Sequence, residues 1–447
     1  MRRFFKQGVF FAAFLLLSLA PGTLASGVAR ESEAGSNGSD FSRGEVLLSL
    51  FEDTEMNFQL LRSLGADSAG GGAPGEILLG AKSIEGGDPA SWSAVFLALG
   101  ERLEQDGKAR LERGHEVSAA ESLLRAASYY RAAEYYGDPL SEETISWGMR
   151  CRETFLQSMA LSPWRVEELK IPFGDIFLPA YFLSPEDVKE GAEEKRKTLL
   201  IQSGFDGTAE EMYFALGKAA LQRGYAVLLF EGPGQVGMRR FHPDSVFLPD
   251  TSPALKAVVD YTLSRPEVDP SKIALYGASF GGYFALSGAV REKRLRGVIA
   301  NSPILDAGEY FFAALGPTFV AMFQSQDLTV EEINELPQEK LPPKYRFSLL
   351  NLCLRYGKPS VQATLEAMKE FRVPEDLLRS MEIPALGMVS ETEGTVPLNQ
   401  AKRFANIAPK GSLHIFSEEQ GANIHCQLDN MPLSWGVALD WLDEQFR

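Results

Sequence analysis

The segment from residue 273 to residue 292 joins an apolar run to a helical pattern through the hexapeptide Gly277-Ala278-Ser279-Phe280-Gly281-Gly282. The apolar run Ile273-Ala274-Leu275-Tyr276 precedes the hexapeptide directly and predicts a buried strand. Glycines two positions before and two after a serine fit a sharp strand-to-helix turn, because the two elements can then cross closely. Such a turn holds the hydroxyl above a sheet edge, at a helix N-terminus whose amides favour negative charge. The segment therefore predicts Ser279 as a candidate nucleophile.

Strand and helix patterns alternate along the second part of the chain. Strands are expected at 198–202, 226–230, 273–276, 297–301, 385–389 and 412–416, and helices at 208–223, 252–265, 280–292, 397–407 and 434–446. The strands are continuous runs of Leu, Ile and Val, as expected when both faces of a sheet are covered. Alternation of this kind implies right-handed crossovers and a parallel sheet. The sequence thus predicts an α/β fold with a doubly wound, mostly parallel sheet, which an antiparallel pair at 166–172 and 176–182 enters.

The remaining segments define the domain organisation that we expect. Residues 44–163 repeat apolar side chains at helical spacing and predict an N-terminal helical domain. Residues 164–447 form the α/β domain, and residues 303–383 interrupt its alternation with an aromatic-rich helical insertion, expected to act as a cap. Residues 26–43 are polar and rich in Ser and Gly, which is typical of a flexible leader.

The first 25 residues have the pattern of a secretory signal peptide. Basic residues precede an apolar run from Val9 to Ala20, and Thr23-Leu24-Ala25 offers a small-residue cleavage site. The apolar run is shorter than the roughly 20 residues that span a bilayer. We therefore expect an exported protein, periplasmic or secreted, without a stable membrane anchor; the alternative is an uncleaved signal anchor.

Charge and cysteine spacing exclude some function classes. Without residues 1–25, which hold three basic and no acidic residues, the chain has 41 basic and 60 acidic residues, a net charge of −19. Such a surface repels phosphate backbones, so we expect no nucleic-acid partner. Cys151, Cys353 and Cys426 lack metal-type spacing, and buried thiols are favoured over a disulfide. We expect neither a metal nor an organic cofactor.

A serine nucleophile needs a base beside it, and one histidine is placed for that role. In doubly wound sheets with this serine turn, the partners follow in the order Ser, acid, His, each after a strand. Of the four histidines, only His425 lies in a loop after the last strand, 412–416. His115 lies in the helical domain, His242 in an earlier loop and His414 within the strand itself. His425 is therefore the candidate base.

The candidate acid lies in the loop after strand 385–389. The orienting carboxylate usually stands about four residues before the proline of a Val-Pro pair, which here selects Glu393 before Pro397. Glu391 is the other candidate in this loop. The alternative is that both glutamates are solvated loop acids without a role in catalysis.

Two backbone amides are expected to stabilise the negative oxygen that forms on attack. One belongs to Phe280, directly after the nucleophile, and the other to a residue in the loop after the third strand. That loop reads Ser203-Gly204-Phe205-Asp206-Gly207-Thr208, which makes the Phe205 N–H the second candidate. The same residues also fit a turn that caps helix 208–223, and the two interpretations are compatible.

These motifs together resemble a known group of proteins. The motifs are the serine turn, the loop Gly204–Thr208, the segment Glu231-Gly232-Pro233-Gly234-Gln235, the loop Gly421–Cys426 and the helical stretch 118–133. The chain resembles, over roughly residues 90–445, the α/β-hydrolases grouped with the fermentation/respiration-switch esterases, 2,6-dihydroxypseudooxynicotine hydrolase and the fungal polyketide-shortening pigment hydrolase. The glutamate at the acid position departs from the more common aspartate.

The resemblance implies a site and an activity. It implies a triad of Ser279, Glu393 and His425, oxyanion amides at Phe205 and Phe280, and an active site between the core and the helical parts. It also implies that the acidic side chain of Asp206 helps to hold the substrate.

The activity expected from these features is that of an exported serine hydrolase. Ester hydrolysis is the default, with C–C bond hydrolysis of a ketone as a variant. The aromatic insertion predicts a small apolar or aromatic acyl or ketone substrate, and the resemblance is compatible with a homodimer. Two alternatives remain: a prolyl-oligopeptidase-type exopeptidase, and a non-catalytic binding protein on a hydrolase scaffold.

Overall fold

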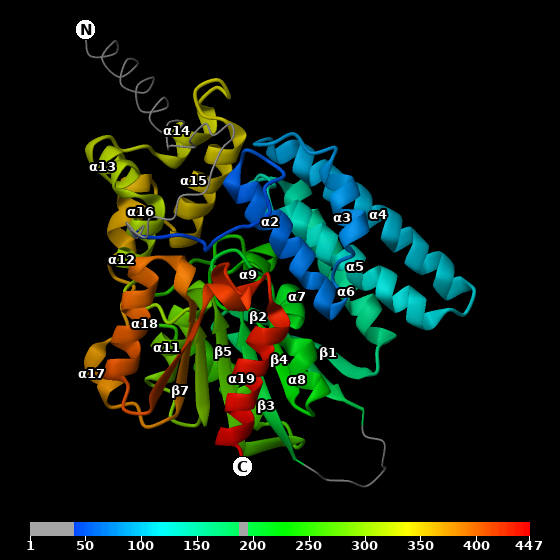
Figure 1. The fold of residues 1–447 in the computed structure, drawn as a ribbon, viewed down its shortest axis with the longest axis vertical. Coiled ribbons are helices and arrows are strands. Elements are labelled where there is room, and N and C mark those ends of the chain that lie inside the picture. Colours follow the sequence, from blue (N-terminus) through cyan, green and yellow to red (C-terminus); the bar gives the residue numbers. More distant parts are fainter. Residues whose placement is uncertain (1–39, 187–194) are drawn as a thin grey trace.

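The computed structural model describes residues 40–186 and 195–447 (Figure 1). The expected signal peptide, 1–25, and residues 26–39 of the expected leader lie outside the described residues. Within the described residues, Cys151, Cys353 and Cys426 are buried free thiols. No helix in these ranges is both long enough and apolar enough to serve as a membrane span.

The central sheet has eight strands in the order β1-β2-β4-β3-β5-β6-β7-β8 (Figure 1). The strands are β1 (Trp164–Phe173), β2 (Ile176–Pro185), β3 (Arg196–Gln202), β4 (Ala226–Phe230), β5 (Val268–Ala278), β6 (Gly297–Asn301), β7 (Ala385–Ser390) and β8 (Gly411–Phe416). β1 pairs with β2 and β2 with β4 in antiparallel register, and the pairs from β4 to β8 are parallel. The predicted α/β fold with a mostly parallel sheet and an antiparallel entry is confirmed.

Both faces of the sheet are buried, which explains the continuous apolar strands. In β3, Leu199 and Ile201 pack into one core and Leu200 into the other. The first core includes α19 (Met431–Gln445) and the segment Ala209–Gln222. The second includes α10 (Ser252–Leu263), α11 (Phe280–Ala289) and α18 (Thr395–Ile407). Successive side chains of the inner strands are therefore apolar, because each face needs its own apolar set.

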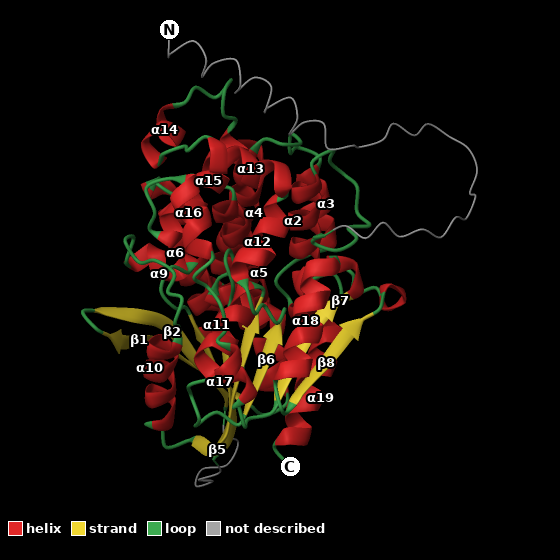
Figure 2. Cartoon of the chain, turned by 90° about the vertical axis from the view of Figure 1, so that its left-hand side faces the viewer, coloured by secondary structure: helices red, strands yellow, loops and turns green. Residues whose placement is uncertain are grey.

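Two groups of helices lie above the carboxyl edge of the sheet (Figures 1 and 2). The N-terminal group comprises α2 (Thr54–Gly65), α3 (Pro74–Ala81), α4 (Pro89–Glu112), α5 (Glu116–Tyr135) and α6 (Glu142–Ala160). The group inserted between β6 and β7 comprises α12 (Ala307–Leu315), α13 (Pro317–Ser325), α14 (Val330–Glu335), α15 (Pro343–Tyr356) and α16 (Val361–Met368). The last helix of the insertion, α17 (Glu375–Arg379), lies lower, next to α18 (Figure 1). The space between these groups and the sheet edge positions the site described below.

The region around Glu231 differs from the sequence prediction. The single helix expected at 208–223 consists of α7 (Ala209–Met212), a π-helical turn (Tyr213–Gly217) and α8 (Lys218–Gln222). A further helix, α9 (Val236–Phe241), forms where a loop was expected. The buried Glu231 carboxylate accepts hydrogen bonds from the backbone N–H of Ala209, at 2.6 Å, and of Gly237. It thus caps two short helices at once, a tertiary contribution that no local propensity reports.

Buried ion pairs attach the N-terminal helices to the sheet. Arg240 of α9 pairs with Glu134 of α5 at 2.5 Å and with Glu210 of α7 at 3.3 Å. Arg152 of α6 donates a 2.6 Å hydrogen bond to the hydroxyl of Tyr181 in β2. Since these charges are removed from water, loss of one partner leaves an uncompensated buried charge. The N-terminal helices are thereby held next to the carboxyl edge.

Candidate active site

Ser279 occupies the sharp turn between β5 and α11. Its backbone has φ 59° and ψ −128°, a conformation that L-residues rarely adopt. A Cβ at Gly281 would lie 2.5 Å from the carbonyl oxygen of Ser203, and one at Gly277 would overlap the backbone of Gly281. Both glycines are therefore required for the crossing of β5 and α11, as the hexapeptide predicts.

A hydrogen-bonded chain links the serine, the histidine and the glutamate. His425 Nε2 lies 2.9 Å from Ser279 Oγ, and His425 Nδ1 lies 2.5 Å from Glu393 Oε2. Glu393 follows β7 and His425 follows β8, so loops from the carboxyl ends of separate strands converge. Glu393 is fully buried, and its Oε1 accepts a 2.9 Å hydrogen bond from the Ser390 N–H.

The surroundings of the imidazole favour its protonated form. Burial opposes that form, but the neighbouring Cys426 and the Glu393 carboxylate together raise the pKa of His425 above its ordinary value. The rival acid, Glu391, is exposed, and its carboxylate accepts a hydrogen bond from the backbone N–H of Glu418. Of the two glutamates, only Glu393 contacts the imidazole.

Two backbone amides lie beside Ser279. Phe280 is the first residue of α11, and the loop after β3 brings Gly204 against it. A Cβ on Gly204 would lie 2.6 Å from the Phe280 nitrogen and 2.9 Å from Ser279 Cβ. Within the described residues, the N–H groups of Phe205 and Phe280 donate no hydrogen bond. The assignment of these two N–H groups to an oxyanion site stays a prediction.

Gln235 fixes this loop, a role that the sequence analysis did not assign. Its side-chain amide donates to the carbonyl oxygens of Ser203, at 2.5 Å, and of Gly204, at 3.3 Å. Its Oε1 accepts a 2.5 Å hydrogen bond from the Gly232 N–H. The carbonyl of Gly204 belongs to the peptide whose N–H is that of Phe205. Gln235 therefore orients one of the two candidate oxyanion donors.

Replacement of Gln235 should lower turnover more than substrate binding. We expect Gln235→Met to reduce kcat by about 10- to 100-fold, below the roughly 100- to 1,000-fold of losing an oxyanion donor outright. KM should change little. Gln400→Met is the matched control, because Gln400 accepts hydrogen bonds from the Leu305 and Asp306 backbone and not from the oxyanion loop. Steady-state ester hydrolysis by both variants measures the separate effects on kcat and KM. An equal loss of kcat in both variants would contradict a positioning role for Gln235.

A short N-terminal segment, residues 40–44, is bound to the loops that carry the acid and the histidine. The Ser42 N–H donates to the Glu393 carbonyl at 2.8 Å, and the His425 N–H donates to the Arg43 carbonyl at 2.9 Å. Gly44 forms a β-bridge with Ile424. Residues 40–43, the end of the expected leader, thus support the backbone of both loops.

Gly44 is the position where this segment is most sensitive. Its φ is +89°, and a Cβ there would overlap the Asn423 carbonyl. We expect Gly44→Val to lower the free energy of unfolding by at least about 1–2 kcal/mol, the cost of a left-handed conformation, and to lower kcat/KM. Gly436→Ala in α19 has open space and should be neutral or stabilising by up to about 1 kcal/mol. Thermal unfolding and ester hydrolysis are measured for both variants. Wild-type stability and activity of Gly44→Val would contradict the role of this segment in supporting the two loops.

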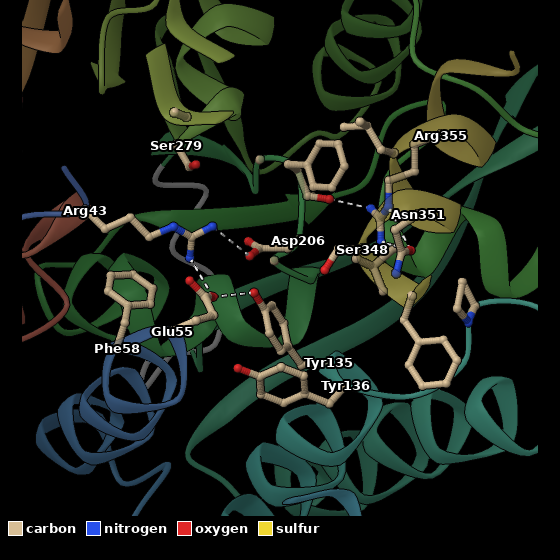
Figure 3. A pocket seen from close by; sticks show the side chains of 18 of the residues that line it. Arg43, Glu55, Phe58, Tyr135, Tyr136, Asp206, Ser279, Ser348, Asn351 and Arg355 are labelled. Atoms are coloured by element: carbon tan, nitrogen blue, oxygen red, sulfur yellow. Dashed lines mark hydrogen bonds and ion pairs between the residues drawn. The ribbon is translucent and has the colours of Figure 1, made fainter. Parts of the chain in front are cut away.

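Ser279 and His425 open into a cavity of about 980 Å³ between the sheet edge and the two helix groups. Aromatic side chains from both groups form much of its wall: Phe58, Tyr135 and Tyr136 from the N-terminal helices, and Phe311, Phe319 and Phe323 from the insertion. Figure 3 shows the labelled residues around this space. The volume and the apolar wall suit a small organic ligand.

Asp206 lines the same cavity, but its carboxylate is paired. It lies 3.4 Å from Arg62 Nη1. It also lies 4.0 Å from Arg43 Nη2, a pair that Figure 3 shows. Burial would raise the pKa of Asp206, yet the surrounding guanidinium groups of Arg62, Arg43, Arg131 and Arg355 hold it below its usual range. These arginines could not be predicted from a local motif, because they come from four separate segments of the chain.

The other three histidines lie apart from Ser279. His115 precedes α5, and His414 lies in β8. His242 follows α9, and its Nε2 accepts a hydrogen bond from the Phe177 N–H at 3.4 Å. The structure therefore brings His425 alone among the four to the serine.

Known proteins with similar sequences are hydrolases. The prolyl oligopeptidase family model matches residues 217–332, the segment with the serine turn. Hydrolase ORFZ of Pyricularia oryzae is 30% identical over 354 residues, 75% of this chain and 82% of that protein. Hydrolase LUC6 of a Fusarium species is 27% identical over 425 residues, 89% of this chain and 98% of that protein.

Solved structures share the fold at lower sequence identity. The structure of 2,6-dihydroxy-pseudo-oxynicotine hydrolase has a TM-score of 0.63 and 22% identity, and covers 85% of this chain and 94% of its own. The structure of AbyA5 has a TM-score of 0.60 and 18% identity, and the match covers 88% of this chain and 93% of AbyA5. The sheet order, the serine turn and these similarities lead to one conclusion. The chain belongs to the α/β-hydrolases.

Proposed function

We propose that this protein is an exported serine hydrolase whose nucleophile, base and orienting acid are Ser279, His425 and Glu393. The observation that carries the proposal is the continuous hydrogen-bonded chain from Ser279 Oγ through the imidazole to Glu393. Export is supported by the basic and apolar pattern of residues 1–25.

The first half of the reaction forms an acyl-enzyme. Ser279 Oγ attacks the substrate carbonyl while His425 Nε2 removes the hydroxyl proton. The carbonyl oxygen becomes negative and accepts hydrogen bonds from the N–H groups of Phe205 and Phe280. Glu393 keeps the Nδ1 proton in place and stabilises the imidazolium. The tetrahedral intermediate then collapses, and His425 Nε2 delivers its proton to the leaving group.

The second half releases the acid. His425 removes a proton from water, and the resulting hydroxide attacks the acyl carbonyl of Ser279. The same two amides stabilise the second oxyanion, and the proton returns to Ser279 Oγ. An ester is the default substrate because an alkoxide or phenoxide leaves easily. The aromatic wall supports an apolar or aromatic acyl group, and we expect Asp206, which lines the same cavity, to accept a hydrogen bond from a substrate hydroxyl.

Labelling with a fluorophosphonate probe tests the proposal directly, because the reagent reacts only with an activated serine. We expect the wild-type chain to be labelled at Ser279, and His425→Gln to be labelled at a greatly reduced rate. Mass spectrometry of the labelled peptide locates the adduct. A wild-type chain that stays unlabelled would refute the proposal.

A peptidase activity is the second candidate, and the match of residues 217–332 to the prolyl oligopeptidase family favours it. A substrate panel separates the candidates: aryl esters, aminoacyl-naphthylamides and an aryl β-diketone that reports C–C cleavage. We expect the highest kcat/KM on the esters. Faster cleavage of the naphthylamides would favour the peptidase instead.

A further inference from the structure

The cavity beside Ser279 has an excess of positive charge, although the chain as a whole has a formal net charge of −16. Four carboxylates line it: Glu55, Glu134, Asp206 and Glu211. Seven cationic side chains line it: Arg43, Arg62, Arg131, Arg239, Arg240, Lys344 and Arg355. A concave wall of low polarizability concentrates the field of such an excess, so the cavity attracts an anionic group.

Five of these cations are neutralised by the protein itself. Each has a carboxylate oxygen within 4.0 Å: Arg43 with Glu55, Arg62 with Glu211, Arg131 with Glu211, Arg240 with Glu134 and Lys344 with Asp53. Among the residues that the structure describes, Arg239 and Arg355 have no such partner. The excess is therefore localised at these two side chains.

Arg355 of α15 is 7% exposed and is held only by neutral acceptors. It donates to the carbonyl of Phe205, and it lies 3.4 and 3.5 Å from Asn351 Oδ1 (Figure 3). Arg239 donates to the Ser245 carbonyl at 2.9 Å. Burial and the neighbouring Arg239 lower the pKa of Arg355 to about 10, against the opposing effect of Asp206, Glu134 and Glu231, none of which forms an ion pair with it.

A buried cation without a counter-charge is costly, because its desolvation is not offset by an ion pair. A ligand anion removes that cost when it binds. A guanidinium presents parallel N–H donors that match the two oxygens of a carboxylate. We propose that Arg355, with Arg239 beside it, binds a carboxylate of the substrate. The hydrolase then acts on acyl substrates that carry this carboxylate away from the scissile carbonyl.

The position of Arg355 relates this subsite to the chemistry. Its guanidinium bonds the carbonyl of Phe205, whose N–H is offered to the oxyanion. The proposed carboxylate subsite therefore adjoins the loop that also carries the Phe205 N–H. In the view of Figure 3, Asp206 lies between Ser279 and Arg355. The inference rests on the proposed function for its substrate class, but the anion subsite can be measured without turnover.

Two matched series of aryl esters test the inference. Each acyl chain ends in a carboxylate in one series and in the corresponding primary amide in the other, over increasing chain length. At the best length, we expect wild-type kcat/KM to favour the carboxylate by at least about 10-fold, since charge-assisted hydrogen bonds exceed neutral ones. Arg355→Gln and Arg239→Gln should each reduce this ratio, mainly through KM. Lys344→Met should keep it, because Lys344 is paired with Asp53.

Thermal unfolding in suberate, a dicarboxylate without a scissile bond, gives a readout independent of catalysis. We expect suberate to raise the Tm of the wild type and of Lys344→Met, but not of Arg355→Gln. Equal kcat/KM for the two ester series, or a ratio that survives both arginine variants, would overturn the inference and leave the hydrolase proposal intact. Suberate binding that depends on Arg355, without hydrolysis of any ester, naphthylamide or β-diketone, would retain the subsite and overturn the hydrolase proposal.

Discussion

Ser279→Ala should abolish ester hydrolysis while leaving the fold intact. Removal of Oγ deletes the atom that forms the acyl-enzyme, so we expect kcat to fall by about a million-fold, the size seen when a triad serine is lost. The backbone turn is retained, because Gly277 and Gly281 still provide the space for it. Steady-state hydrolysis of an activated aryl ester measures the loss, and thermal unfolding checks the fold.

Ser348→Ala is the matched control for this variant. Ser348 lines the same cavity, but its hydroxyl donates to the Lys344 carbonyl in its own helix at 2.9 Å. We expect its kcat to stay close to wild type. Wild-type turnover by Ser279→Ala would remove Ser279 from the mechanism, whatever the control does.

Glu393→Gln should lower kcat by about 1,000- to 10,000-fold and also change the pH profile. An amide holds the imidazole tautomer poorly and does not stabilise the imidazolium, which accounts for the loss. The reaction needs neutral His425, and the Glu393 carboxylate contributes to raising the pKa of that imidazole. The wild-type kcat/KM should therefore fall with decreasing pH at a midpoint above the ordinary histidine value.

The direction of the pH shift distinguishes the two glutamates. Without the carboxylate at residue 393, the imidazole loses its proton more easily, so the acid limb should move to lower pH. Glu391→Gln changes an exposed side chain that bonds the Glu418 N–H, so rate and profile should match wild type. If Glu391→Gln reproduced the loss and Glu393→Gln did not, the assignment of the acid would be reversed.

The fold and the serine–histidine pairing could be predicted because each has a local signature. Strands covered on both faces are continuous apolar runs, and the turn at Ser279 needs glycine at 277 and 281 whatever surrounds it. Only one histidine follows the last strand. For the acid, the loop was determined by the topology, but the selection of Glu393 over Glu391 rested on a spacing rule. The structure adds the contact between Glu393 and His425.

Features that depend on distant segments could not be predicted. Helix α9 forms because Glu231 caps it together with α7, whereas the preceding segment Gly232-Pro233-Gly234 favours a loop. The binding of residues 40–44 to the loops of Glu393 and His425 joins parts of the chain about 350 residues apart. Gln235 was noted as part of a motif, but its hydrogen bonds to Ser203 and Gly204 appear only in the folded chain.

The sequence by itself determined the α/β architecture, the position of Ser279 and the order of its partners, because periodicity and backbone sterics act over a few residues. Only the tertiary structure decided the charge of the cavity. Its seven cations come from five separate segments, and whether each is neutralised depends on partners such as Glu55, Glu134 and Glu211 that folding brings within 4.0 Å. Two opposite charges form an ion pair only when they lie close together, and the packed fold sets the distance between residues that are remote in the sequence.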